Sequence, residues 1–198
     1  MKTLLFLGMT ALSIGTAQAA LTNVALNSSV TLQGNHFGNA GGWGGSVLAP
    51  AASITDGILL PNGRQWNTGT VFWAGPPRQD SITIALRGSS LVQSILLQAD
   101  SNDLYTIRYR DTSNTWHNLT TLDLPTRWGL NTRSYTLNRA IHATAFSILA
   151  AGGDNHFSVS EFQAWGITSA VPEPETYALV GMGLVALTLR LRNRKTHR

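Results

Sequence analysis

The tryptophans are the residues in this sequence best suited to holding a ligand, because aromatic faces stack on sugar rings and cover apolar surface. Trp43 and Trp73 are each surrounded by glycines, which favours exposed loops. His36 and Arg78 lie in loop-like segments nearby and can donate hydrogen bonds to hydroxyl groups. We therefore predict a ligand-binding site made of Trp43, Trp73, Arg78 and His36. The alternative is that the rings fill the core and the polar groups are ordinary surface residues.

Motifs typical of catalysis are missing from the sequence. It has no Gly-x-Ser-x-Gly elbow, no His-Glu-x-x-His pair and no phosphate-binding loop. The carboxylates are scattered, so spacing selects no glycosidase pair. The absence of cysteine excludes disulfides, thiolate metal sites and a cysteine nucleophile. The sequence predicts a protein that is not an enzyme, and a glycan-acting hydrolase is the least favoured alternative.

The positive charge of the chain is concentrated at its ends. The formal net charge of the 198 residues is +4, yet between Ala20 and Ala170 eight arginines balance seven aspartates and one glutamate. A formally neutral domain offers little electrostatic attraction to phosphates, so we expect no nucleic-acid partner. The C-terminal cations instead indicate a membrane-topology signal.

Both ends of the chain carry targeting patterns. Residues 1–19 combine a lysine, an apolar run and the small residues Ala17-Gln18-Ala19, which is typical of a secretory signal peptide removed by signal peptidase. At the other end, a charge-free stretch over 176–189 precedes a basic tail. We expect a transmembrane helix there that leaves the domain outside the cytoplasm, with a buried core helix as the alternative.

This C-terminal segment, residues 170–198, resembles the PEP-CTERM sorting signal of Gram-negative bacteria. Its three parts are present in order: the motif Pro172-Glu173-Pro174, a hydrophobic helix and an arginine-rich tail. The resemblance implies recognition by an exosortase-type processing enzyme and transfer to the cell surface or extracellular matrix. It also implies an exopolysaccharide or biofilm context.

The residues between the two ends, 20–169, show short strand signals separated by Gly, Asn, Asp and Pro. Ile82, Ile84 and Leu86 alternate with polar residues, as a half-buried strand requires. Glycine-rich 35–45 and the region 64–78 are predicted as loops. The strands that we predict are 81–86, 92–98, 105–110, 134–137, 145–149 and 158–166. Their regular spacing favours an all-β sandwich.

The order of features over residues 21–167 resembles a discoidin-like (coagulation factor V/VIII type C) domain. The resemblance is carried by Asn23 to Asn27, Ile54 to Gly57, Trp66, Tyr105 to Tyr109 with Trp116, and Val159 to Phe162. It implies a galactose-binding-like jelly-roll sandwich. Members of this family mostly bind glycans, lipids or protein surfaces through loops at one end.

The resemblance also implies a structural Ca²⁺, held by Asp56 and Glu161. Calcium takes six to eight oxygen ligands, so backbone carbonyls would have to complete the site. The alternative is that Asp56-Gly57 is a turn and Glu161 a surface residue. The apolar Ile58-Leu59-Leu60 that follows departs from the polar loop usual in the family.

The function predicted from the sequence is that of an exported, surface-sorted binding module for extracellular polysaccharide or another cell-surface ligand. The alternative is a structural envelope or matrix component without a small ligand, which the low net charge of the domain would favour because low charge promotes association. Glycan binding by the domain separates the two.

Overall fold

The computed structural model describes residues 20–44, 47–123, 128–168 and 182. In these residues the chain forms eight antiparallel strands and one short 3₁₀ helix, and no helix has the length and apolar character needed to cross a membrane. The predicted signal peptide lies outside the described residues, as does the predicted sorting segment apart from Met182. The elements are β1 (Thr22–Asn23), β2 (Ser29–Gln33), η1 (Ala51–Thr55), β3 (Val71–Ala74), β4 (Ser81–Asp100), β5 (Leu104–Arg110), β6 (Trp116–Asp123), β7 (Leu130–Ala151) and β8 (His156–Thr168).

Two long strands belong to both layers of the sandwich. The first part of β4 pairs with β2 and with the second part of β7, as in Ile84↔Phe146. The second part of β4 pairs with β8 and with the first part of β7, as in Ile95↔Tyr135. Register shifts after Ala85 and Val92 mark where β4 bends, because an extra residue in one strand kinks the ladder.

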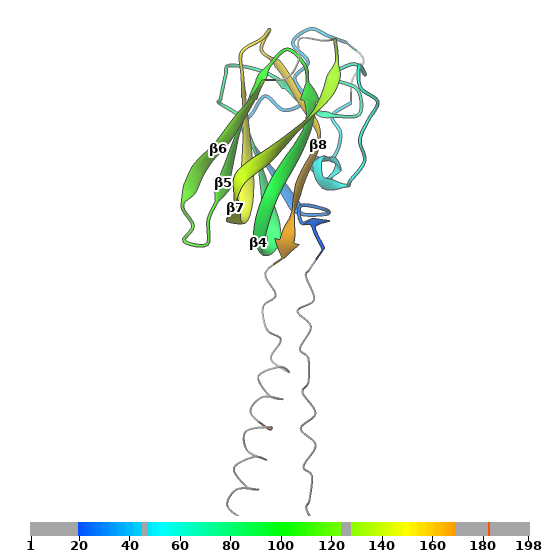
Figure 1. Cartoon of the computed structure of the whole chain (residues 1–198). Helices are drawn as coiled ribbons and strands as arrows, with labels where there is room; N and C mark the ends of the chain where they lie inside the picture. The colour runs from blue at the N-terminus through cyan, green and yellow to red at the C-terminus, as the bar shows by residue number, and fades with distance from the viewer. Residues whose placement is uncertain (1–19, 45–46, 124–127, 169–181, 183–198) are drawn as a thin grey trace, which may run out of the picture.

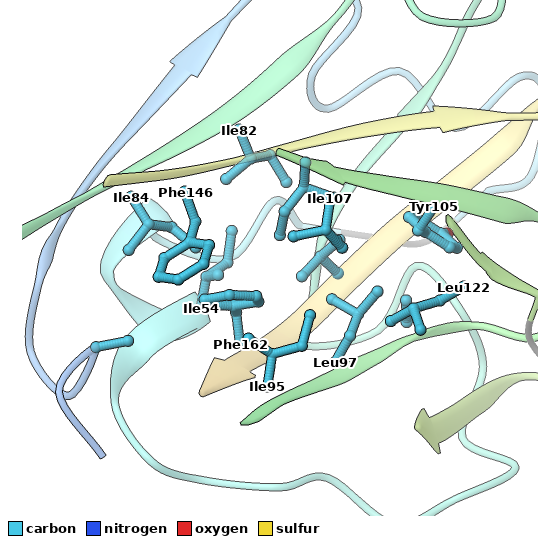
Figure 2. Close-up of a cluster of buried hydrophobic side chains, with 14 of the residues drawn as sticks. Ile54, Ile82, Ile84, Ile95, Leu97, Tyr105, Ile107, Leu122, Phe146 and Phe162 are labelled. Carbon is cyan, nitrogen blue, oxygen red and sulfur yellow. The ribbon is translucent and has the colours of Figure 1, made fainter. Parts of the chain in front are cut away.

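The hydrophobic core fills the space between these layers (Figure 2). Side chains alternate along β5, so that Tyr105 and Ile107 face inward while Thr106 and Arg108 face outward. Phe146 of one layer and Phe162 of the other meet at a ring-centroid distance of 5.1 Å. Each fully buried large side chain contributes about 1.5–3 kcal/mol through loss of water contact.

Most of the long loops lie at one end of the sandwich, and the domain begins and ends at the other (Figure 1). The pair Thr22↔Gly166 brings the beginning and the end of the domain together. At the opposite end, which we call the apex, β4 ends at Asp100, β5 begins at Leu104 and β8 begins at His156. The fold therefore gathers residues distant in sequence at the apex and keeps them away from the chain ends.

The all-β sandwich predicted from the sequence is confirmed, with differences in how the strands are divided. The signals at 81–86 and 92–98 belong to the single strand β4, and those at 134–137 and 145–149 belong to β7. The region 64–78, predicted as a loop, contains the buried strand β3.

Candidate functional site

A pocket of about 200 Å³ opens at the apex between three tryptophans and several polar side chains. Trp43 is 50 % exposed and Trp128 is 66 % exposed, so both present ring surface to a ligand. Trp66 is buried and forms part of the wall. We call this the apex pocket, and its lining includes Trp43, Trp66, Trp128, Asp100, Asn102 and Asp154.

The loop that carries Trp43 is held against the start of β8. Asn39 donates from Nδ2 to the Ala74 carbonyl at 3.0 Å, and its Oδ1 accepts from the Gly41 N–H at 2.9 Å. Gly41 has φ +57°, and a Cβ there would lie 2.2 Å from Nε2 of His156. Only glycine allows this approach, which brings the loop close to the apex end of β8.

Trp128 is positioned by the start of β7. The Leu130 N–H donates to the Arg64 carbonyl at 2.9 Å, and the Leu130 carbonyl accepts from the Gly63 N–H at 2.7 Å. This pairing brings Trp128, which directly precedes Gly129, next to the loop that contains Trp66. Trp66 is fixed edge-on to Phe72, with ring centroids 5.6 Å apart. Two separate segments thus form the aromatic walls.

The polar side of the pocket is formed where β4 ends and β8 begins. Asp100 accepts a hydrogen bond from the Ser101 N–H at 2.9 Å. In the amide orientation that satisfies all partners, Asn102 donates to Asp103 Oδ2 at 3.2 Å and to Asp100 Oδ2 at 3.1 Å. Asp154 lies 3.4 Å from Nδ1 of His156. The pocket therefore combines ring surface with oxygen acceptors.

Burial controls the charge of these carboxyl groups. It raises the pKa of Asp100 to about 6, although the Ser101 N–H partly offsets the effect. Burial, with repulsion from Asp100 and Asp154, raises the pKa of Asp103 to about 9. Asp103 is 1 % exposed, and its Oδ1 has no hydrogen-bond partner among the described residues. Within the described chain every salt bridge is a His–Asp pair, so no arginine neutralises the cluster.

The structure separates the four residues predicted to bind ligand. Trp43 lines the apex pocket. Trp73 is 1 % exposed within β3, with Phe37 and Phe157 packed around its ring, so it is a core residue with no free face for a sugar. His36 donates from Nδ1 to Asp80 Oδ2 at 2.7 Å, which fixes the loop that carries His36. Arg78 lines a different groove, on the side of the sandwich.

Asp56 lies near enough to Glu161 for its charge to act on that carboxyl group. Glu161 is fully buried; its Oε1 accepts from Gln163 at 3.2 Å, while Oε2 has no partner among the described residues. Burial, with a smaller contribution from the charge of Asp56, raises the pKa of Glu161 to about 7, against the opposing effects of the Gln163 amide and the Gly57 N–H. The described residues contain no cluster of three His, Cys, Asp or Glu suited to a metal.

Several residues of the apex pocket were not singled out from the sequence. Asp100 and Asp154 are not among the site residues predicted from the sequence. A signal for Asp100 was available, because a buried strand ends at Asp100-Ser101-Asn102-Asp103. Its nearness to Trp43 depends on the tertiary fold and has no counterpart in the local sequence.

Comparison with known proteins confirms the sorting signal and the fold. A family model described as the PEP-CTERM protein-sorting motif matches residues 170–195. A search of curated proteins finds no match.

Solved structures similar to this chain include carbohydrate-binding proteins. A fucolectin from striped bass (Morone saxatilis) serum is 13 % identical with a TM-score of 0.56, over 78 % of this chain and 52 % of that one. The family 32 carbohydrate-binding module of Streptococcus pneumoniae EndoD is 11 % identical with a TM-score of 0.52, over 72 % and 98 %. The family 32 module of Clostridium perfringens NanJ, solved with galactose, is 15 % identical with a TM-score of 0.50, over 74 % and 98 %. These likenesses establish the fold.

Proposed function

We propose that this protein is an exported, non-catalytic module that binds a polysaccharide through the apex pocket. The observation that carries the proposal is the grouping of Trp43, Trp66 and Trp128 around one pocket with Asp100, Asn102 and Asp154. Exposed rings supply stacking surface for the apolar face of a sugar. The neighbouring oxygens accept hydrogen bonds from its hydroxyl groups.

The charge of the apex pocket favours particular sugars. Its carboxyl groups are unpaired with arginine in the described structure, so an acidic sugar would meet repulsion as they ionise. A neutral sugar, or one with a free amine, meets none. We therefore expect the apex pocket to bind oligosaccharides containing glucosamine better than those containing glucuronate.

A binding role fits the apex pocket better than hydrolysis. A glycosidase needs two carboxyl groups facing each other across the scissile bond. Asp103, whose pKa is the most strongly raised of the cluster, is buried and does not line the pocket. The two carboxyl groups that do line it, Asp100 and Asp154, both belong to its polar side, where β4 ends and β8 begins.

We further propose that Asp56 and Glu161 hold a structural Ca²⁺. The unpartnered, fully buried Oε2 of Glu161 is the group that fits such an ion, because a buried carboxylate without a partner is costly. The Asp56 charge close by supplies a second anionic oxygen donor. The ion, when bound, would neutralise both groups and tie the η1 region to β8.

The sorting motif at 170–195 indicates export with a membrane-anchored signal. In the proposed life cycle, signal peptidase removes residues 1–19 and the C-terminal helix holds the protein in the membrane with the domain outside. An exosortase-type enzyme then processes the segment near Pro172-Glu173-Pro174 and passes the domain to the cell surface or matrix, in a biofilm or exopolysaccharide context.

A glycan array tests the proposed function. Residues 20–169 would be applied with Ca²⁺ and then with chelator, alongside the exopolysaccharide of the producing cell. Selective binding to neutral or amine-bearing glycans supports it. The absence of binding under both conditions would contradict it and favour a structural matrix component.

A further inference from the structure

A second groove, distinct from the apex pocket, lies on the outer face of β5 and β6. It has a volume of about 340 Å³ and shares no lining residue with the apex pocket. We call it the side groove, and it is lined by Arg78, Thr106, Arg108, Asn118, Thr121 and Leu149. We propose that the side groove is a second binding site, which takes the carboxylate groups of an acidic, uronate-containing polysaccharide.

Strand register explains why these side chains meet. Thr106 pairs with Thr121 and with Leu149, and Arg108 pairs with Asn118. Because successive residues of β5 alternate between the faces of the sheet, Thr106 and Arg108 point outward. Strands β5 and β6 thus place arginine, amide and hydroxyl groups on one surface, beside Leu149 of β7.

Arg108 is held in place by stacking while part of its guanidinium stays unsatisfied. Its Cζ lies 5.6 Å from the centroid of the Trp116 ring, and Cζ of Arg110 lies 5.7 Å from the same ring. The Nε atom of Arg108 is buried and has no hydrogen-bond partner among the described residues. Because Nε is enclosed, the terminal amino groups of the guanidinium are the ones that a carboxylate ligand would meet.

Arg78 reaches the side groove from a rigid turn. Its N–H donates to the Ala150 carbonyl at 2.8 Å, and its φ is +60°. A left-handed backbone is costly for a residue other than glycine, so it persists where surrounding contacts fix it. Pro76 and Pro77 immediately before it restrict the turn further. Because the backbone is already fixed, binding has only the Arg78 side chain left to order.

The charge of the side groove selects an anion. Its lining contains two arginines and no carboxylate, and no arginine forms a salt bridge in the part of the chain that the structure describes. A guanidinium presents paired N–H groups that match the two oxygens of a carboxylate. Asn118 and the two threonines can bond sugar hydroxyls beside it. A nucleic acid would need a longer row of cations than the neutral domain supplies.

The test is titration of the full chain, in mild detergent, with oligogalacturonate and with the same oligomer as its neutral methyl ester. We expect the acid form to bind more tightly than the ester, and its binding to weaken as salt screens the charges. Arg78→Gln and Arg108→Gln should each reduce affinity about tenfold or more, since hydrogen bonds between charged partners are worth about 1.5–3 kcal/mol. Arg108→Lys keeps the charge but not the paired N–H geometry. Its affinity should therefore fall between that of the wild type and that of Arg108→Gln.

Arg139→Gln is the matched control, because it removes an exposed arginine of β7 outside the side groove. It should bind like the wild type, and so should Trp43→Ala. The proposal is overturned if the ester binds as well as the acid, if Trp43→Ala abolishes binding of the acid, or if Arg139→Gln lowers affinity as much as Arg108→Gln. A further outcome is binding of neutral glycans that depends on Trp43, without any binding of the acid. This outcome would overturn the proposed uronate site in the side groove and would still support glycan binding at the apex pocket.

Discussion

The hydroxyl group of Tyr105 forms two hydrogen bonds with the backbone of Ser158. It donates to the Ser158 carbonyl at 3.0 Å and accepts from the Ser158 N–H at 3.2 Å. Tyr105 lies on β5 and Ser158 on β8, so one buried side chain joins the two layers directly below the apex. This link fixes the start of β8 relative to the strand that carries the side groove.

Removing that hydroxyl group should destabilise the fold. Tyr105→Phe leaves two buried backbone groups of Ser158 without their partner, and we expect a loss of about 1–3 kcal/mol in the free energy of unfolding. Urea denaturation of residues 20–169 measures it. Tyr109→Phe is the control, since Tyr109 is partly exposed and stacks on His117, and it should cost less than about 0.5 kcal/mol. Equal losses for the two variants would contradict the role of the Tyr105 hydroxyl.

The pKa of Asp103 makes stability depend on pH. With a folded-state pKa of about 9, raised mainly by burial, the folded domain keeps a proton that the unfolded chain releases above its ordinary value of 3.8. Stability should therefore fall as pH rises through this window. Asp103→Asn should flatten the fall in melting temperature between about pH 5 and about pH 8, measured in chelator. Asp123→Asn, at an exposed position of β6, should leave the fall in melting temperature with pH unchanged.

Calcium should stabilise the domain most at higher pH. Glu161, with its pKa raised to about 7 chiefly by burial, holds a proton in acid and competes with the ion there. Ca²⁺ at about 100 times its dissociation constant would add about 2.7 kcal/mol to the free energy of unfolding. We expect the melting temperature to rise with Ca²⁺ more at about pH 8 than at about pH 5, as scanning calorimetry would record. If Glu161→Gln keeps the same calcium response, the ion binds elsewhere.

Glycan affinity should depend on the exposed rings of the apex pocket. Trp43→Ala and Trp128→Ala should each weaken binding of the best array ligand about tenfold, because each removes a stacking face. Trp165→Ala is the matched control: this ring is partly exposed but lies at the end of the sandwich where the chain leaves. Isothermal titration compares the three. A loss of affinity in Trp165→Ala alone would place the ligand away from the apex.

The sequence was sufficient for the fold class because its strands are strongly patterned. Alternation at Ile82-Thr83-Ile84 and along Tyr105 to Tyr109 survives in β4 and β5. The sequence does not indicate that the signals at 81–86 and 92–98 form one strand. The residues Arg87-Gly88-Ser89-Ser90 between them have the composition of a turn, although they continue β4. β3 was missed because its four buried residues lie between glycine and proline, which locally indicate a loop.

The site could be predicted only in part, for a physical reason. Trp43 and Trp73 have similar glycine-rich surroundings in the sequence, yet one ring is exposed and the other is enclosed by Phe37 and Phe157. Which ring is enclosed depends on pairing of β3 with β8, a contact between residues more than eighty positions apart. The carboxyl groups of the apex are likewise brought to Trp43 by tertiary structure alone.

Strand β8 also determines how the domain would carry mechanical load. It runs from the apex at His156 to Thr168, shortly before the sorting segment, and is paired with β4 from Val159 to Thr168. A polymer pulling at the apex and an anchor pulling beyond Thr168 would stretch the molecule along this strand. Hydrogen bonds of an antiparallel ladder lie across that direction, so they resist together in shear and do not unzip one after another. The attachment geometry therefore suits a tether that must hold against flow.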